Sequence, residues 1–171
     1  MNYFEIKNNT IDESVIHEIR PFLIEKWRKY MTIFIGIFML FFALYGNTSP
    51  YDSVRVITAF GFPLFIFSII QVIRMPIIAE KRMLQTLEAI HTGSYCCDIS
   101  LTENGIKINN SSAEINYNYI SRIVITERTI ALFTKSNACL IIRKDGLEFK
   151  TYNQIVDFLH SICKNAKLIY K

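Results

Sequence analysis

The sequence predicts an α+β membrane protein, in which an N-terminal transmembrane helical hairpin precedes an antiparallel β-sheet closed by a C-terminal amphipathic helix. Two observations carry this prediction. Residues 30–51 and 56–73 contain no charged side chain, and each stretch is about long enough to cross a hydrocarbon core about 30 Å thick as a helix. Beyond them, short segments alternate apolar and polar residues, as strands with one solvated face do.

The hairpin is expected over residues 30–74. Both stretches are apolar on every side of the helix, without the polar face of an amphipathic helix. The chain has only 171 residues, of which 51% are hydrophobic, so the remaining residues are too few to surround two such helices in a soluble core. The segment GNTSP at residues 46–50 supplies turn chemistry between them. Gly36, Gly61 and Pro63 are candidates for close helix contact or a kink.

Basic residues predict the orientation of the hairpin. They flank its outer ends, whereas the connecting loop holds only Arg55, so both termini are expected on the cytoplasmic side of a bacterial inner membrane. The spans carry no ionisable side chain, which argues against transport and favours an anchor. The flanking basic residues are Lys26, Arg28, Lys29, Arg74, Lys81 and Arg82.

The region after the hairpin is predicted to be a helical connector over residues 75–93, ending at Gly93, and a sheet domain over residues 94–171. Turn-rich residues at 103–105, 109–112, 127–128 and 135–137 separate short strand-like segments, so consecutive strands should form an antiparallel meander. TYNQIVDFLHSICKNAK then has helical spacing, with Thr151 or Asn153 as the expected cap. The predicted strands are SYCCDISLT, GIKINN, AEINY, ISRIVITE, TIALFT and ACLIIR.

The N-terminal residues 1–29 add a strand and a short helix. Tyr3 to Lys7 is strand-like, and Asp12 or Ser14 is expected to cap a helix that runs toward Arg20. If both termini are cytoplasmic, this strand can pair with the sheet from the far side of the hairpin and cover one of its edges.

No arrangement of residues predicts catalysis, a cofactor or a metal site. His17, His91 and His160 lie in separate segments without ligand or triad spacing, and no glycine loop for phosphate is present. The net charge of +4 is explained largely by the flanks of the hairpin, so nucleic acid is not an expected partner. Four cysteines are interpreted as small buried hydrophobes in a reducing cytosol: Cys96, Cys97, Cys139 and Cys163.

An ordered set of short segments carries a resemblance. Glu103-Asn104-Gly105-Ile106 is followed by Ser111-Ser112, by INYNYI at residues 115–120, by Thr126-Glu127, and by LII at residues 140–142 with Lys144. With two spans before them, these segments resemble the YcxB-like family of small bacterial membrane proteins over roughly residues 27–165. Arg143 stands where family members commonly carry proline, so this strand end can continue pairing.

The resemblance implies a pleckstrin-homology-like soluble part, a fold that binds peptides or lipid headgroups and is not catalytic. Some family members lie beside toxin genes and are regarded as immunity proteins. The first hypothesis is therefore a membrane-anchored immunity protein with the lipid bilayer and a toxin as partners. Its contact surface would include Tyr117, Tyr119 and Arg122, since aromatics and arginine dominate interfaces; ordinary strand packing is the alternative for these three residues.

The second hypothesis is a membrane-tethered sensor or antiphage effector. Its sheet would bind a lipid headgroup or a nucleotide through a basic pocket, and its spans would transmit the signal or oligomerise. The candidate ligand-binding residues are Arg128, Lys135, Arg143 and Lys144, together with Arg122. The sequence leaves homo-oligomerisation open.

Overall fold

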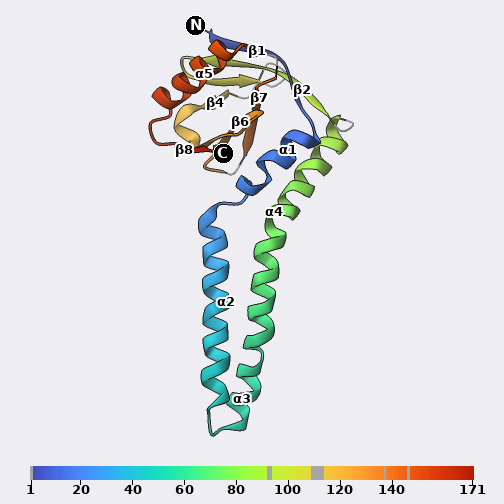
Figure 1. Cartoon of the computed structure of the whole chain (residues 1–171), viewed down its shortest axis with the longest axis vertical. Helices are drawn as coiled ribbons and strands as arrows, with labels where there is room; N and C mark the ends of the chain where they lie inside the picture. The colour runs from blue at the N-terminus through green and yellow to red at the C-terminus, as the bar shows by residue number, and fades with distance from the viewer. Residues whose placement is uncertain (1, 92–93, 109–113, 137, 146) are drawn as a thin grey trace. The chain divides into compact units, whose positions relative to one another are not determined.

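The structure, a computed structural model, describes residues 2–91, 94–108, 114–136, 138–145 and 147–171. The chain divides into two compact units (Figure 1). We call Met1–Ile19 together with Leu84–Lys171 the sheet unit, and Arg20–Met83 the helical unit. The sheet unit is thus built from both sides of the helical unit in the sequence.

Two four-stranded sheets form the sheet unit within the described residues. Sheet A has the order β1-β2-β3-β4, and all its pairs are antiparallel. Sheet B has the order β7-β6-β5-β8, in which β5 pairs antiparallel with β6 and parallel with β8. The strands are β1 (Asn2–Ile11), β2 (Tyr95–Thr102), β3 (Gly105–Ile108), β4 (Glu114–Asn116), β5 (Ile120–Ile125), β6 (Thr129–Thr134), β7 (Cys139–Arg143) and β8 (Lys167–Tyr170).

The predicted pairing of the N-terminal strand with the sheet is confirmed. β1 runs antiparallel to β2, with Ile6 opposite Ile99 and Ile11 opposite Tyr95. The register shifts between Ile6 and Asn9, and in this bulge Asn8 has a φ of 55°. Asparagine tolerates that left-handed conformation better than most residues. The bulge therefore turns the second half of β1 without ending its pairing.

All six predicted strands occur, but they do not form one sheet. The one-turn 3-10 helix η2 (Tyr117–Tyr119) interrupts the chain between β4 and β5, so sheet A ends there and sheet B begins. The parallel strand β8 was not predicted, because residues 164–167 were assigned to the end of the preceding helix. The single antiparallel meander was therefore wrong in two respects.

A shared core holds the two sheets and helix α5 (Phe149–Ile162) together. Apolar residues at every second strand position face it, as expected for strands with one buried face. From α5 the core receives Ile155 and Leu159, which are 0% and 1% exposed. The strands contribute Ile99, Leu101, Ile106, Ile123, Ile125, Ile130, Leu132 and Ile142.

The starts of the two helices in the sheet unit, α1 and α5, test the capping predictions. In α1 (Glu13–Ile19), Asp12 Oδ1 accepts hydrogen bonds from the Val15 N–H at 3.1 Å and the Ser14 hydroxyl at 2.6 Å, which confirms Asp12 as the cap. Helix α5 begins at Phe149, with Glu148 as N-cap and no side-chain capping bond. The expected caps Thr151 and Asn153 were wrong, because both lie inside the helix.

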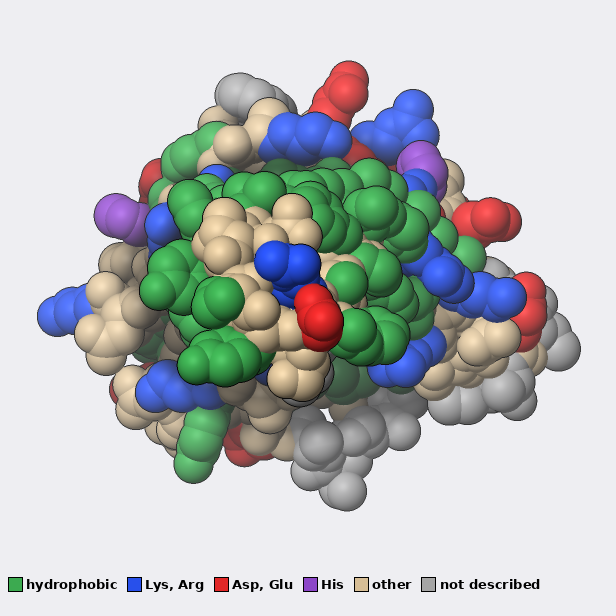
Figure 2. All heavy atoms as spheres, turned by 90° about the horizontal axis from the view of Figure 1, so that it is seen from below, with side chains coloured by type: hydrophobic (Ala, Val, Ile, Leu, Met, Phe, Trp, Pro, Cys, Tyr) green, Lys and Arg blue, Asp and Glu red, His purple; other side chains and the backbone are tan. Residues whose placement is uncertain are grey.

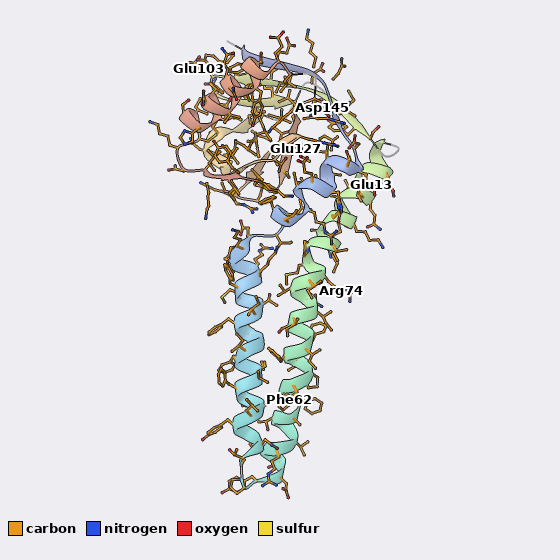
Figure 3. The ribbon with its side chains drawn as sticks, viewed as in Figure 1. Glu13, Phe62, Arg74, Glu103, Glu127 and Asp145 are labelled. Carbon is orange, nitrogen blue, oxygen red and sulfur yellow. The ribbon has the colours of Figure 1, made fainter. Side chains whose placement is uncertain are left out.

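Two helices are long and apolar enough to cross a membrane, judged by length and composition. They are Lys26–Asn47 and Asp52–Glu88, the second running through α3 (Asp52–Ala59) into α4 (Gly61–His91). The first is α2 (Lys26–Asn47), which the 3-10 helix η1 (Arg20–Phe22) precedes. Their large side chains project outward along the unit, as Figure 3 shows with Phe62 on α4.

Small residues form the seam between the helices of this unit. A Cβ added at Gly36 would lie 1.9 Å from Ser68 Oγ, and one at Gly46 would lie 2.0 Å from Thr58 Cγ2. At Gly61 it would lie 2.4 Å from the Met39 carbonyl oxygen. Only glycine permits approaches this close. The expectation of close helix contact at Gly36 and Gly61 is confirmed.

The second long helix continues beyond the predicted span. α4 runs to His91 with Pro76 inside it, so the connector expected over residues 75–93 is part of the same helix as far as His91. The expected helix end at Gly93 lies outside the described residues. So do the expected turn at residues 109–112 and Asn137. Within the helical unit, Arg20 Nε lies 3.3 Å from Glu80 Oε2 and joins η1 to α4.

Candidate functional site

Tyr117, the first residue of the predicted contact surface, lies in the core. It is 5% exposed, and its hydroxyl donates a hydrogen bond of 2.8 Å to the Thr102 carbonyl. Its ring meets that of Phe158 edge-on, with centroids 5.9 Å apart. Burial raises the pKa of the Tyr117 hydroxyl. These contacts link β2, η2 and α5, so Tyr117 supports the fold.

Tyr119 is the exposed aromatic residue of the predicted set. Its side chain is 63% exposed, and its carbonyl accepts a hydrogen bond of 2.8 Å from the Lys135 N–H. Lys135 is also exposed. The two residues therefore share one end of sheet B, where β5 begins and β6 ends.

Arg122 lies apart from the core on the opposite side of β5 from Ile123. Its guanidinium carbon is 4.5 Å from the centre of the Phe133 ring, a cation–π arrangement. In the strand register, Arg122 is opposite Phe133 on one side and Lys167 on the other. Arg122 is half-buried. The three residues predicted as one surface thus occupy three different environments.

The four candidate ligand-binding residues do not form one cluster: three lie together and the fourth lies at the other end of β6. The turn between β5 and β6 lies beside the end of β7 and brings together Arg128, Arg143 and Lys144. There the Lys144 N–H donates a hydrogen bond of 2.7 Å to the Arg128 carbonyl, and Thr129 pairs with Arg143 in the strand register. Figure 3 labels Glu127 in that turn and Asp145 after β7. Lys135 is at the other end of β6.

Arg143 is held by two carboxylates. Its Nη1 lies 2.7 Å from Asp12 Oδ2, and its Nε lies 2.7 Å from Asp145 Oδ2. The hydrogen bond to Asp145, followed by that to Asp12, raises the pKa of the guanidinium above its ordinary value. The Ser14 hydroxyl contributes most to the lowered pKa of Asp12, with smaller contributions from the Val15 N–H and Arg143. Arg143 therefore joins α1 to the end of β7.

Lys144 is held as well. Its ammonium donates a hydrogen bond to the Thr126 carbonyl and lies 4.3 Å from the centre of the Tyr152 ring. With Arg143 and Lys144 engaged, Arg128 and Lys135 are the exposed cations of the predicted pocket, at opposite ends of β6. Among the residues that the structure describes, no group of three His, Cys, Asp or Glu side chains is arranged to hold a metal ion.

Asn9, which the sequence did not single out, closes one edge of sheet B. Its Nδ2 donates to the Ile141 carbonyl at 2.8 Å, and its Oδ1 accepts from the Arg143 N–H at 2.8 Å. It is 3% exposed. The amide side chain thereby occupies backbone groups of β7 that a neighbouring strand would use. A hollow of about 500 Å³ lies beside it, lined by residues 5–10 of β1 with Arg143, Asp145 and Leu147.

A second group that the sequence did not single out follows α5. Lys164, Lys167 and Lys171 are all exposed and lie before, within and after β8. No Asp or Glu occurs among residues 158–171. The available signal was this run of lysines without acidic residues, but the sequence analysis extended the helical segment to residue 167 and did not consider them.

Comparison with known proteins finds one resemblance. Residues 101–159 match the family model described as YcxB-like protein. The match runs from the end of β2 into α5 and includes neither long helix of the helical unit. The resemblance predicted from the sequence is confirmed over this segment. No curated protein matches the chain, and no solved structure matches it.

Proposed function

We propose that this chain is a membrane-anchored, non-catalytic binding protein. In this proposal, α2 and α4 cross the bacterial cytoplasmic membrane as a hairpin, and the sheet unit binds a partner at the cytoplasmic face. One observation carries the anchor: the helical unit buries its small residues and exposes its large apolar ones. Figure 2, a view of the helices end on, shows hydrophobic side chains gathered around its centre.

Exposure values give this pattern in numbers. Phe34, Phe38 and Phe41 are 65%, 59% and 66% exposed, whereas Ala43 is 1% exposed. Gly36 and Gly46 are also buried. Water would oppose such an arrangement, because each exposed aromatic side chain loses about 1.5–3 kcal/mol of hydrophobic stabilisation. Lipid does not, and helix pairs in lipid associate through small residues.

The ends of α2 fit the two interfaces of a bilayer. Its 22 residues extend about 33 Å at 1.5 Å per residue, close to the thickness of a hydrocarbon core. Trp27 and Tyr30 lie near one end and Tyr45 near the other, and all three are exposed. Amphipathic rings favour the headgroup region, and basic residues favour the cytoplasmic side. Lys26, Arg28 and Lys29 support that side for the N-terminal end.

The sheet unit supports the binding part of the proposal. With the helices between β1 and β2 set aside, the unit has four strands in sheet A, then three in sheet B, then helix α5. This order favours a pleckstrin-homology-like fold, to which β8 is an addition. Because β1 precedes the hairpin and β2 follows it, two chain connections tether the unit to its anchor. Tethering raises the local concentration of the unit for a partner at the membrane.

For the partner, we propose a polypeptide, with a cognate toxin as the specific candidate implied by the family resemblance. The alternative of a lipid headgroup or nucleotide needs converging free cations. Arg143 and Lys144 are engaged with carboxylates, a carbonyl and a ring, which weighs against that pocket. Arg128 and Lys135 lie too far apart along β6 to form it by themselves.

Purification from the native host tests the proposal. The tagged full-length chain would be extracted with alkaline carbonate to show integral membrane association, and then solubilised in mild detergent to identify co-purifying molecules. A stoichiometric polypeptide that stops growth when it is expressed without this chain would support immunity. A bound lipid or nucleotide without a polypeptide would replace immunity by the sensor. Release of the chain by carbonate would refute the anchor.

A further inference from the structure

The two edges of sheet B differ in how they are closed. At the β7 edge, Asn9 bonds both the Ile141 carbonyl and the Arg143 N–H at 2.8 Å. A side chain there takes the place of another strand. Native proteins close sheet edges in such ways because an open row of N–H and C=O groups invites pairing with another chain.

The β8 edge is open in the part of the chain that the structure describes. β8 is the last strand in the order β7-β6-β5-β8. On its inner side, the Lys171 N–H donates to the Ile125 carbonyl at 3.0 Å. Backbone groups of successive strand residues point to alternate sides. The N–H and C=O of Tyr170 therefore point outward, and its side chain is 67% exposed.

The charge around this edge favours one kind of occupant. Lys164, Lys167 and Lys171 are exposed, and residues 158–171 contain no acidic side chain. A second copy pairing through β8 would bring lysines against lysines, which is unfavourable at short range. An extended segment rich in Asp or Glu would instead complement the edge.

A hollow of about 200 Å³ opens beside the chain just before β8. It is lined by Tyr117, Asn118, Ile162, Cys163, Lys164 and Asn165. These residues precede β5 and β8, so the hollow lies at the end of sheet B where both strands begin, and a side chain from the same end of an added strand can reach it. In strand addition, backbone hydrogen bonds supply affinity and side-chain pockets supply specificity.

We propose that the outer edge of β8 binds an extended, acidic segment of a partner protein by strand addition. This inference rests on the proposed function and specifies the chemistry of the protein partner. The segment adds a fifth strand to sheet B. Its backbone pairs with Leu168 and Tyr170, and its carboxylates lie near Lys164, Lys167 and Lys171.

Peptide binding to the detergent-solubilised full-length chain tests this edge. The probe is a fluorescein-labelled peptide of eight residues that alternates Glu with Thr and Val, and its matched control has Lys in place of Glu. Fluorescence anisotropy should show saturable binding of the Glu peptide and at least tenfold weaker binding of the Lys peptide, about 1.4 kcal/mol. No binding at millimolar peptide, or equal binding of both peptides, would overturn the proposal.

Two variants separate strand addition from simple charge attraction. Tyr170→Pro removes the N–H that points away from β5 and leaves the hydrogen bonds to β5 in place. Tyr170→Ala removes the ring but keeps this N–H. One lost hydrogen bond should weaken binding about threefold to tenfold in the proline variant, whereas the alanine variant should stay within about twofold of the native chain. Equal affinities of the two variants would overturn strand addition. Unfolding temperatures of both variants would be recorded to show that β8 remains in place.

A charge reversal leaves the backbone untouched and keeps the proposal testable if the proline variant misfolds. Lys167→Glu with Lys171→Glu should reverse the preference from the Glu peptide to the Lys peptide. An unchanged preference would contradict the proposal. Membrane anchoring is measured separately by carbonate extraction, so an anchored chain that ignores the peptide refutes the edge alone. A chain that binds the peptide but is released by carbonate refutes the anchor alone.

Discussion

The sheet unit and the helical unit arrange the same residue types in opposite ways. In the sheet unit, Phe133 and Leu132 are 1% exposed, whereas Lys164, Lys167 and Lys171 are exposed. In the helical unit, Phe38 is 59% exposed, while Gly36 and Ser68 occupy the seam. Because apolar surface avoids water, this difference supports the proposed anchor, in which the two units face different solvents.

The largest expected effect comes from truncating a buried ring in the sheet unit. Phe133→Ala should lower the free energy of unfolding by about 3–5 kcal/mol, because it leaves a cavity and removes the ring beneath Arg122. Phe38→Ala, at a position 59% exposed, is the matched control and should leave the sheet unit unchanged. Denaturant unfolding in detergent measures both. Equal losses would show that the two rings do not have opposite roles.

A charge placed on an exposed ring position should distinguish lipid from water. Phe38→Lys should cost about 2.5–3.5 kcal/mol of membrane insertion if α2 crosses a bilayer. Tyr119→Lys, at a position of similar exposure in the sheet unit (63%), should have little effect. The inserted fraction in an in vitro translation assay with membranes reports the difference. An inserted fraction that lysine leaves unchanged at both positions would contradict the proposal that only the helical unit faces lipid.

Loss of the amide that closes the β7 edge should have an intermediate effect. Asn9→Ala removes the partners of the Ile141 carbonyl and the Arg143 N–H, and should destabilise the sheet unit by about 1–3 kcal/mol. Asn153→Ala on the exposed side of α5 is a suitable control. Thermal unfolding compares the two variants. If the Asn9 variant were as stable as this control, the edge would not depend on the amide.

The smallest expected effect is a dependence on acidic pH. The pKa of Asp12 is lowered from its ordinary value of 3.8, mainly by the Ser14 hydroxyl. Its contribution to stability is therefore complete above the unfolded pKa and is lost as the pH falls through the lower, folded pKa. Asp12→Asn should be less stable than the native chain at neutral pH, and the gap should close in acid. Unfolding curves across acidic pH would show whether the gap is constant, which would contradict this assignment.

The sequence predicted the elements of this molecule better than their arrangement. Strand alternation located all six strands from β2 to β7, and the uncharged windows located the two long helices, because both signals are local. The orientation of the hairpin predicted that the N-terminal strand can join the sheet, but it did not predict β2 as the partner. η2 breaks the alternation at Tyr117, so the sequence could not tell that this ring turns into the core.

The roles of the candidate site residues could not be predicted where they depend on contacts between residues far apart in the sequence. Arg143 has the sequence signature of an exposed strand-end cation, but Asp12, more than a hundred residues earlier, neutralises it. Asn9 has no sequence pattern that marks its role, because that role depends on the bulge in β1, which directs the Asn9 side chain toward β7. β8 was missed because four residues flanked by lysines are too short for a clear alternation.

Labelling of two introduced thiols tests whether α2 and α4 form a membrane hairpin with the sheet unit on the cytoplasmic side. Asn47→Cys lies at the end of α2 and Gln154→Cys on the exposed side of α5, and each would be placed in a Cys96→Ser background. Three native cysteines remain in this background. Burial raises the thiol pKa of half-buried Cys139 to about 12 and that of buried Cys163 to about 11, and it also raises that of buried Cys97, so all three should react slowly at neutral pH.

In intact spheroplasts, an impermeant maleimide should label position 47 and spare position 154 until the cells are lysed. That result would place the connection between the two long helices outside the membrane and the sheet unit in the cytoplasm. Equal labelling of both positions before lysis, or recovery of the chain in the soluble fraction, would contradict the membrane hairpin.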